Sequence, residues 1–324
     1  MPESGSSKIE IERISISATG KFGDSGTGYI EVYHHNWMPD AAQQYRTYLE
    51  SAYYEHVLDA NTKIRAGKGR QLNFGITPSY GNRKTTQYGI VSEAFTQDRI
   101  IGIQLTHQKD TLYAGATLFT DHRVGTRKAG AFPNAPNDKQ VSYFADRDVP
   151  NDSSGKLAGS VKIGYETPEL KGHFSAAVGN LKQADADFIG TNTQAGYVNG
   201  TNTNKDHYKF GLDLTYKPNE FIVQGEWYQG KLSYVRQTGW SILAGYEPKG
   251  KDRAYIRYAM LDNNQTRTSS QYTWDVDQLT LGYVHPITKG VWLEANYEFN
   301  NERRGPGQSK VKNDLFFVEL FTGF

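Results

Sequence analysis

Apolar and polar side chains alternate along residues 207–230, on both sides of one short break. An aromatic residue or leucine occupies every second position of 208–216, and the alternation resumes over 221–228. This period of two is that of a strand with one apolar and one polar face. The break contains Pro218 and Asn219, and both residue types favour turns. The segment is therefore predicted to be a β-hairpin.

Two-faced segments of the same kind recur along the whole chain, and fifteen of them can be counted as strands. They lie within residues 13–18, 30–32, 45–56, 64–66, 101–106, 112–118, 160–165, 173–178, 208–216, 221–228, 240–246, 253–261, 278–284, 291–299 and 315–324. A single-chain bacterial barrel with both ends on one side of the membrane needs an even number of strands. We therefore expect sixteen strands, with fourteen or eighteen as alternatives. Residues 88–95 and 141–144 are the candidates for a strand missing from the count.

The connections between these segments alternate between short and long. Short connections are 59–62, 109–111, 167–171, 217–220, 247–251 and 285–289, whereas long ones are 71–98, 121–155, 180–205, 262–272 and 300–313. Tight periplasmic turns and long extracellular loops are typical of outer-membrane barrels. The chain also ends on Phe324, in a strand with apolar alternation, which resembles the terminal signal of such proteins. The predicted fold class is all-β, a transmembrane antiparallel β-barrel in the bacterial outer membrane. Leu212 and its neighbours of the same parity would face lipid, and Asp213 would face water.

Composition is compatible with this fold and narrows the function. The chain has 324 residues, a net charge of +1, a mean hydropathy of −0.67 and no cysteine. A helical membrane protein is not expected, because no apolar run approaches the roughly 18 residues of a spanning helix. The near-zero net charge gives no support for nucleic-acid binding, and no cofactor or metal site is expected. Residues 1–7 are interpreted as a flexible or added N-terminus before one barrel domain over residues 8–324.

Charged residues on the polar parity, or in the connections, are the candidates for the lining of a pore. Residues 63–99 carry seven bases against two acids, whereas the long connection 121–155 carries five of each. The candidate anion-binding residues are Arg46, Lys63, Arg65, Lys68, Arg70, Arg99, Arg123, Arg127 and Lys128. The candidate opposing acidic wall is Glu226, Glu294 and Glu298. Bases facing acids can steer anions, but the same side chains can pair with each other and fix the wall. The connection 121–155 could fold inward as a constriction or remain a surface loop.

Residues 64–75 resemble the phosphate-selective (O/P-type) porin family, which has a strand ending in glycine, a basic residue and a Pro-Phe-Gly run. Here Asn73 stands in place of that proline. Residues 98–103, 281–283 and 296–298 resemble further stretches of the family. The likeness is spread over residues 44–324 and implies a trimeric channel of sixteen strands with a long loop folded into the pore.

The function predicted from these patterns is a porin for passive diffusion of small hydrophilic solutes, with a weak bias toward anions. Its expected partners are outer-membrane lipid, lipopolysaccharide, the solutes and two further copies of the chain in a homotrimer. One alternative is a barrel that does not conduct and scaffolds a partner protein. An outer-membrane hydrolase is less favoured, because none of the eight histidines has a recognisable catalytic spacing. A soluble all-β protein is the remaining alternative.

Overall fold

The computed structural model describes residues 13–35, 46–77, 84–85, 88–96, 99–122, 124–128, 142–146, 153–193, 196–264, 275–303 and 314–322. These ranges contain seventeen strands and two helices, and fifteen of the strands join in a single sheet. Among the described residues, no helix is both long and apolar enough to cross a membrane.

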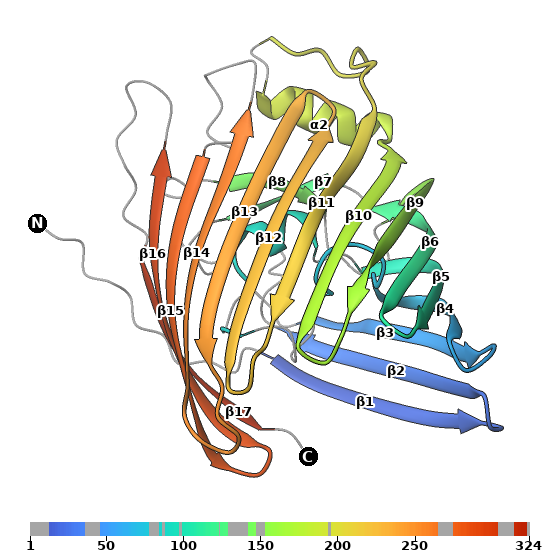
Figure 1. Cartoon of the computed structure of the whole chain (residues 1–324). Coiled ribbons are helices and arrows are strands. Elements are labelled where there is room, and N and C mark those ends of the chain that lie inside the picture. The colour runs from blue at the N-terminus through green and yellow to red at the C-terminus, as the bar shows by residue number, and fades with distance from the viewer. Residues whose placement is uncertain are drawn as a thin grey trace, which may run out of the picture.

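The large sheet follows the order of the sequence and skips only β7 and β8. Its strands are β1 (Arg13–Phe22), β2 (Gly26–His35), β3 (Arg46–Val57), β4 (Thr62–Arg70), β5 (Arg99–Lys109), β6 (Leu112–His122), β9 (Ser153–Glu166), β10 (Leu170–Asn180), β11 (Asp206–Tyr216), β12 (Phe221–Leu232), β13 (Val235–Tyr246), β14 (Arg253–Asn264), β15 (Asp275–Thr288), β16 (Val291–Arg303) and β17 (Leu315–Thr322). Every neighbouring pair is antiparallel. Figure 1 shows the sheet curving round on itself as a barrel wall.

All fifteen segments identified by alternation are wall strands, so the antiparallel barrel is confirmed. The described residues account for fifteen of the sixteen strands expected. Both candidates for a missed strand were wrong, because neither segment joins the wall. Residues 88–95 lead into a short helix, α1 (Ile90–Phe95), and residues 141–144 overlap β8 (Ser142–Asp146), which pairs only with β7 (Val124–Lys128). Figure 1 shows β7 and β8 behind β11 to β13.

The two faces of the wall differ as the alternation predicts. In β11, Leu212 is 54% exposed and its neighbour Asp213 is 5% exposed. Large apolar side chains stay exposed on the outer face of almost every wall strand, including Ile103, Leu118, Val161, Leu212, Ile242, Ile256, Leu281, Phe299 and Val318. An outward apolar face is what hydrocarbon requires, whereas water would disfavour a patch of this extent. This face is the lipid-facing belt of the barrel.

Exposed aromatic residues border this belt at its short-turn end. Tyr216, Phe221 and Tyr246 adjoin the turns, and the rings of Phe221 and Tyr246 lie 5.2 Å apart. Rings with a polar edge favour the boundary between hydrocarbon and water. In the turn between β11 and β12, Asn219 adopts a left-handed φ of 54°, a conformation that asparagine tolerates well.

The other end of the barrel carries the long connections. There α2 (Gln183–Thr193) lies across the ends of β11 to β13 (Figure 1). Leu181 and Ile189 pack there with Phe144 of β8 and with Leu232 and Val235 of the wall. The β7–β8 hairpin is therefore fixed between α2 and the barrel wall.

Candidate functional site

The barrel encloses a segment of its own chain. The connection between β4 and β5 enters the lumen, and we call its described part, 71–77, 84–85 and 88–96, the inward segment. A buried apolar cluster joins this segment to inward side chains of the wall. The segment contributes Phe74, Ile90, Val91, Ala94 and Phe95, and the wall contributes Ala177, Tyr228, Ala259, Leu261 and Val276. A long loop folded into the barrel, as the family resemblance implied, is therefore present in the connection 71–98. In the connection 121–155, β8 contacts α1, and Gln237 of the wall donates to the Phe144 carbonyl at 2.6 Å, so this described strand also packs inside the barrel.

Asn73 fixes the start of the inward segment to β5 and β6. Its amide nitrogen lies 2.9–3.1 Å from Thr117 Oγ1, Ala116 O and Leu105 O. Its amide oxygen accepts a hydrogen bond of 2.9 Å from the Tyr113 hydroxyl. Proline has no side-chain donor or acceptor, so it could make none of these bonds. The departure from the family's Pro-Phe-Gly run therefore creates a polar anchor.

Gly75 and Ile76 are held by three strands in turn. Lys162 Nζ donates to the Gly75 carbonyl at 2.6 Å, and the Gly75 N–H donates to Ser175 Oγ at 3.0 Å. The Ile76 N–H donates to the Tyr228 hydroxyl at 3.3 Å. Gly75 has a φ of +58°, and an added Cβ would stand 2.6 Å from the Tyr228 oxygen. Glycine is therefore required here both by conformation and by close approach.

The far part of the inward segment is anchored by cations. Arg257 Nη1 donates to Thr85 Oγ1 at 2.8 Å and to the Tyr88 carbonyl at 3.0 Å. Lys209 Nζ donates to the Phe95 carbonyl at 2.8 Å, which caps the C-terminal end of α1. Arg257 and Lys209 are 4% and 6% exposed. Buried cations need such partners, so these residues fasten the segment to the wall.

Lys84 extends the inward segment to the short-turn end of the barrel. Its Nζ lies 2.9 Å from Glu247 Oε1, in the turn after β13. Glu247 also receives Lys217 Nζ at 2.6 Å and the Tyr255 hydroxyl at 2.9 Å. Burial by itself would raise the pKa of Glu247, but the bonds from Lys217 and Lys84 outweigh it and lower the pKa to about 2. The segment therefore spans from the β4 end of the lumen to this turn.

A small cavity of about 30 Å³ remains between the inward segment and the wall. Its lining is mixed, with Lys84, Tyr88 and Ser92 from the segment, and Glu226 and Arg257 from the wall. The volume suits one or two water molecules held by polar groups. The segment therefore packs against this side of the wall with little space left over.

His173 is the centre of a buried polar group in the wall. Its Nδ1 lies 2.7 Å from Asp213 Oδ1 and its Nε2 lies 2.9 Å from Glu166 Oε1. The ring centroids of Tyr113 and His173 lie 5.5 Å apart in a T-shaped arrangement. A histidine that donates to a carboxylate through each ring nitrogen carries both protons. This arrangement ties β9, β10 and β11 together.

Three of the predicted basic residues converge on Glu50. Arg99 Nε and Arg70 Nη2 both donate to Glu50 Oε1, the latter at 3.3 Å, and Lys68 Nζ donates to the Leu49 carbonyl at 2.6 Å. Glu50 is fully buried and is the extra residue where the pairing of β3 with β2 shifts. A bulge re-aims a side chain, which brings this carboxylate to the arginines. Three cations thus surround one acid.

The other predicted basic residues are dispersed. Arg65 donates to Glu55 Oε2 at 2.7 Å and lies over the ring of Tyr53 at 4.0 Å. Lys63 is exposed on β4. Arg46 lies in β3, and Arg127 and Lys128 lie in β7; for these three residues only the backbone is described. Arg123 lies outside the described residues.

The predicted acidic residues are occupied by wall contacts. Glu226 accepts hydrogen bonds of 3.1 Å from Tyr228 and from Ser241, behind the inward segment. Glu294 accepts one of 2.8 Å from the Trp292 indole. Glu298 accepts one of 3.2 Å from Gln278. Glu294 and Glu298 are 8% and 2% exposed, so the structure gives them partners in the wall.

Two features of the site escaped sequence reasoning. The first is that the connection 71–98 enters the lumen. The signal for it was the apolar run of α1 inside an otherwise polar connection, because such a run indicates burial. The second is Glu50, because a bulge breaks the period of two on which strand parity rests.

Comparisons with known proteins agree with the barrel. No protein-family model matches the sequence, and no curated protein matches it. Among solved structures, the outer membrane channel DcaP of Acinetobacter baumannii is similar at 12% identity and a TM-score of 0.63, over 96% of this chain and 84% of that one. Salmonella typhi OmpF, in complex with daunomycin, is similar at 13% identity and a TM-score of 0.63, over 98% of this chain and 92% of that one. The anion-selective porin of Comamonas acidovorans is similar at 14% identity and a TM-score of 0.52, over 96% of this chain and 86% of that one. At these identities the likeness shows the fold, which is that of outer-membrane porins.

Proposed function

We propose that this chain is a channel of the bacterial outer membrane, through which small hydrophilic solutes diffuse passively. The observation that carries the proposal is the inward segment. A barrel of this many strands is too wide to be filled by its own side chains. A segment fastened along the inner wall by Asn73, Lys162, Lys209 and Arg257 narrows the lumen and fixes its width.

A weak preference for anions is the finer part of the proposal. Arg70 and Arg99 both donate to Glu50, and Lys68 donates to the adjacent Leu49 carbonyl, so three cations gather at this point of the wall. Arg70 also lies close to Tyr88, a residue of the inward segment. A cluster of positive charge beside the narrowed lumen raises the local concentration of anions. One solved structure with this fold is described as an anion-selective porin.

The test is a reversal potential in a planar bilayer under a KCl gradient. We expect a chloride-leaning potential for the wild type and a lower anion/cation permeability ratio for Arg70→Gln/Arg99→Gln. Lys231→Gln is the matched control, because Lys231 pairs with Asp206 at the strand ends. An identical potential in the double variant and the wild type would refute the anion assignment. A folded protein that never conducts would refute the channel and favour the scaffolding barrel.

We further infer a homotrimer in contact with outer-membrane lipid and lipopolysaccharide. The fold and the apolar belt support the membrane environment. Light scattering of the purified protein in detergent, with the detergent contribution subtracted, measures the number of chains. A monomer would contradict the trimer and leave the channel proposal intact.

The geometry at His173 gives the hydrolase alternative no support. Both of its ring nitrogens are engaged by carboxylates at 2.7 and 2.9 Å. A general base needs a ring nitrogen that faces water or a nucleophile, whereas here both nitrogens face side chains of the wall. The described geometry therefore fits a structural role.

A further inference from the structure

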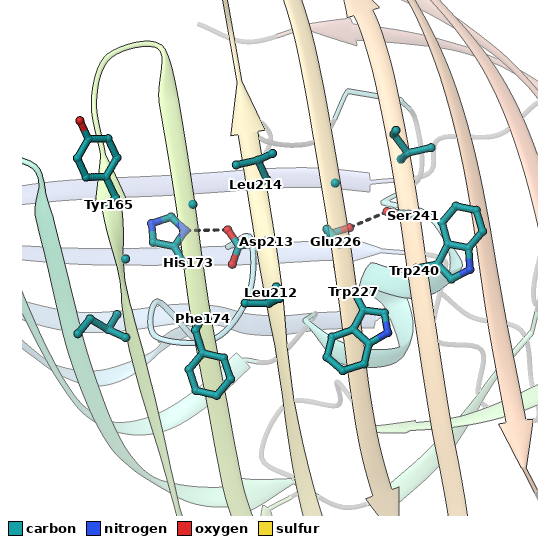
Figure 2. Close-up of a pocket in the computed structure, with 15 residues that line it drawn as sticks. Tyr165, His173, Phe174, Leu212, Asp213, Leu214, Glu226, Trp227, Trp240 and Ser241 are labelled. Carbon is teal, nitrogen blue, oxygen red and sulfur yellow. Dashed lines mark hydrogen bonds and ion pairs between the residues drawn. The ribbon is translucent and has the colours of Figure 1, made fainter.

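Over β9 to β13, aromatic and polar side chains lie on opposite faces of the wall. Figure 2 shows Phe174, Trp227 and Trp240 on these strands, and all three are exposed on the lipid-facing parity. Asp213 and Glu226 lie on the inward parity, where each is hydrogen-bonded to another side chain of the wall. This distribution is the usual one for a barrel, because lipid favours apolar groups and the lumen favours polar ones.

Two tyrosines of β2 and β3 depart from this distribution. Ile30 and Tyr54 are outward residues, 47% and 42% exposed, so their neighbours Tyr29 and Tyr53 point into the lumen. Tyr29 pairs with Tyr53 across the two strands, and their ring centroids lie 5.2 Å apart at an interplanar angle of 31°. Both residues are half-buried. Apolar ring surface is therefore present on the side of the wall that faces water.

Glycines of β4 make room for the Tyr53 ring. Gly67 pairs with Tyr53 in register, and a Cβ at Gly69 would stand 3.2 Å from ring atom Cδ1 of Tyr53. Gly67 has a φ of +128°, and a Cβ there would stand 2.3 Å from the Ala52 carbonyl oxygen. Glycine within a strand marks a close approach of this kind. The Tyr53 ring therefore leans over β4 and forms part of the lumen surface.

Arg65 and Glu55 add polar groups beside this ring. Arg65 Cζ lies 4.0 Å from the centroid of the Tyr53 ring, which is the distance of a cation–π contact. Its Nε and Nη2 both donate to Glu55 Oε2, at 3.1 and 2.7 Å. Within the part of the chain that the structure describes, Arg65 Nη1 and Glu55 Oε1 make no hydrogen bond. The two side chains are 17% and 23% exposed, so a donor and an acceptor remain available next to the ring.

These residues lie where the inward segment leaves the wall open. The anchors of that segment described above, from Asn73 to Arg257, are made with β5 to β14. Tyr29, Tyr53 and Arg65 belong to β2, β3 and β4, and they stay partly exposed. A solute that passes the inward segment can therefore reach them.

We propose that Tyr29, Tyr53, Arg65 and Glu55 form a saccharide-binding site in the lumen, a proposal that rests on the proposed channel and names one class of its solutes. A sugar ring has a face of C–H groups, which packs on the electron-rich face of an aromatic ring. It also has a rim of adjacent hydroxyls, of which one donates to Glu55 Oε1 and the next accepts from Arg65 Nη1. Because Glu55 and Arg65 neutralise each other, the site selects a neutral solute rather than an anion.

The first experiment measures block of the channel by a neutral sugar. The KCl current through single channels in planar bilayers is recorded while maltotriose is added, and the concentration that gives half of the maximal decrease is determined. We expect the wild-type current to decrease, and Tyr53→Leu should need several-fold more maltotriose, because leucine has no aromatic face. Tyr53→Phe keeps the ring and should match the wild type. Tyr54→Leu is the matched control, since it removes a tyrosine from the lipid-facing side of the same strand.

Two further variants keep the test independent of how Tyr53→Leu folds. Tyr29→Leu removes the other ring, and Glu55→Gln removes the carboxylate next to it. Each should raise the half-maximal concentration of maltotriose several-fold. Equal half-maximal concentrations in the wild type and all variants would overturn the assignment to these residues.

The second experiment measures binding without conduction, by equilibrium dialysis of radiolabelled maltotriose against the purified protein in detergent. We expect saturable binding by the wild type and several-fold weaker binding by Tyr53→Leu. A channel that conducts KCl, but neither binds maltotriose nor is blocked by it, would overturn the site and keep the proposed function. Binding by a barrel that never conducts would keep the site and refute the channel. Stronger block by nicotinamide, a flat neutral solute without hydroxyls, would overturn the assignment to saccharides.

Discussion

Replacing Phe74 by alanine should release the inward segment from the wall. Phe74 is 1% exposed, and its ring centroid lies 5.5 Å from that of Tyr228. Lys209 Nζ lies 4.8 Å from the same centroid. Loss of a buried phenylalanine costs about 3–5 kcal/mol, and every 1.4 kcal/mol is a factor of about ten. The ratio of docked to undocked segment should therefore fall by at least about a hundredfold.

Single-channel recording in planar bilayers measures this change directly. Phe74→Ala should show a larger unitary conductance, or frequent transitions to one, because the segment then leaves the lumen for part of the time. Phe299→Ala is the matched control, since it removes an equal ring from the lipid-facing side, where Phe299 is 42% exposed. Folding of each variant is checked by the heat-dependent shift in gel mobility. A folded Phe74→Ala with the conductance and open-channel noise of the wild type would refute the role of the segment as constriction.

Two further predictions concern the ends of the inward segment. In Gly115→Ala the new Cβ would stand 1.8 Å from the Asn73 amide oxygen. The Asn73 side chain must therefore shift, and we expect the open-channel noise in single-channel recordings to increase. Gly225→Ala is the control, because a Cβ there meets open space, and it should leave the conductance unchanged. Glu247 has its pKa lowered to about 2 from 4.5, so its bonds stabilise the fold fully above pH 4.5 and this contribution disappears as pH falls through about 2. The contribution is at most about 3 kcal/mol, reduced by screening at exposed Lys217. In thermal unfolding, wild type should therefore exceed Glu247→Gln at pH 6, and the two midpoints should converge between pH 4.5 and pH 2; a constant difference across that range would contradict the assignment.

The strands were predictable because each depends on a local pattern. A wall strand between lipid and an aqueous or polar interior must alternate, and alternation is visible in the sequence without knowledge of its neighbours. The loop lengths added the class of barrel. Contacts inside the lumen were not predictable, because they join residues far apart along the chain, such as Lys209 with Phe95 and Arg257 with Thr85.

The basic residues illustrate the same limit. Their number between residues 63 and 99 could be counted from the sequence, but their partners could not. Lys68, Arg70 and Arg99 meet at Glu50 only because β3 contains an extra residue there, and Arg65 pairs with Glu55 through the register of β3 with β4. A regular alternation predicts neither the bulge nor the register.

The anchors of the inward segment also impose an order of folding. Phe95 is held by a lysine 114 residues later in the chain, and Thr85 by an arginine 172 residues later. Contacts of such separation form late, since the entropy of closing the intervening chain must first be overcome by other contacts. The start of the segment can dock on β5 and β6, but its far part is not fully anchored until β14 has joined the sheet. The channel therefore acquires its final width only after most of the wall has assembled.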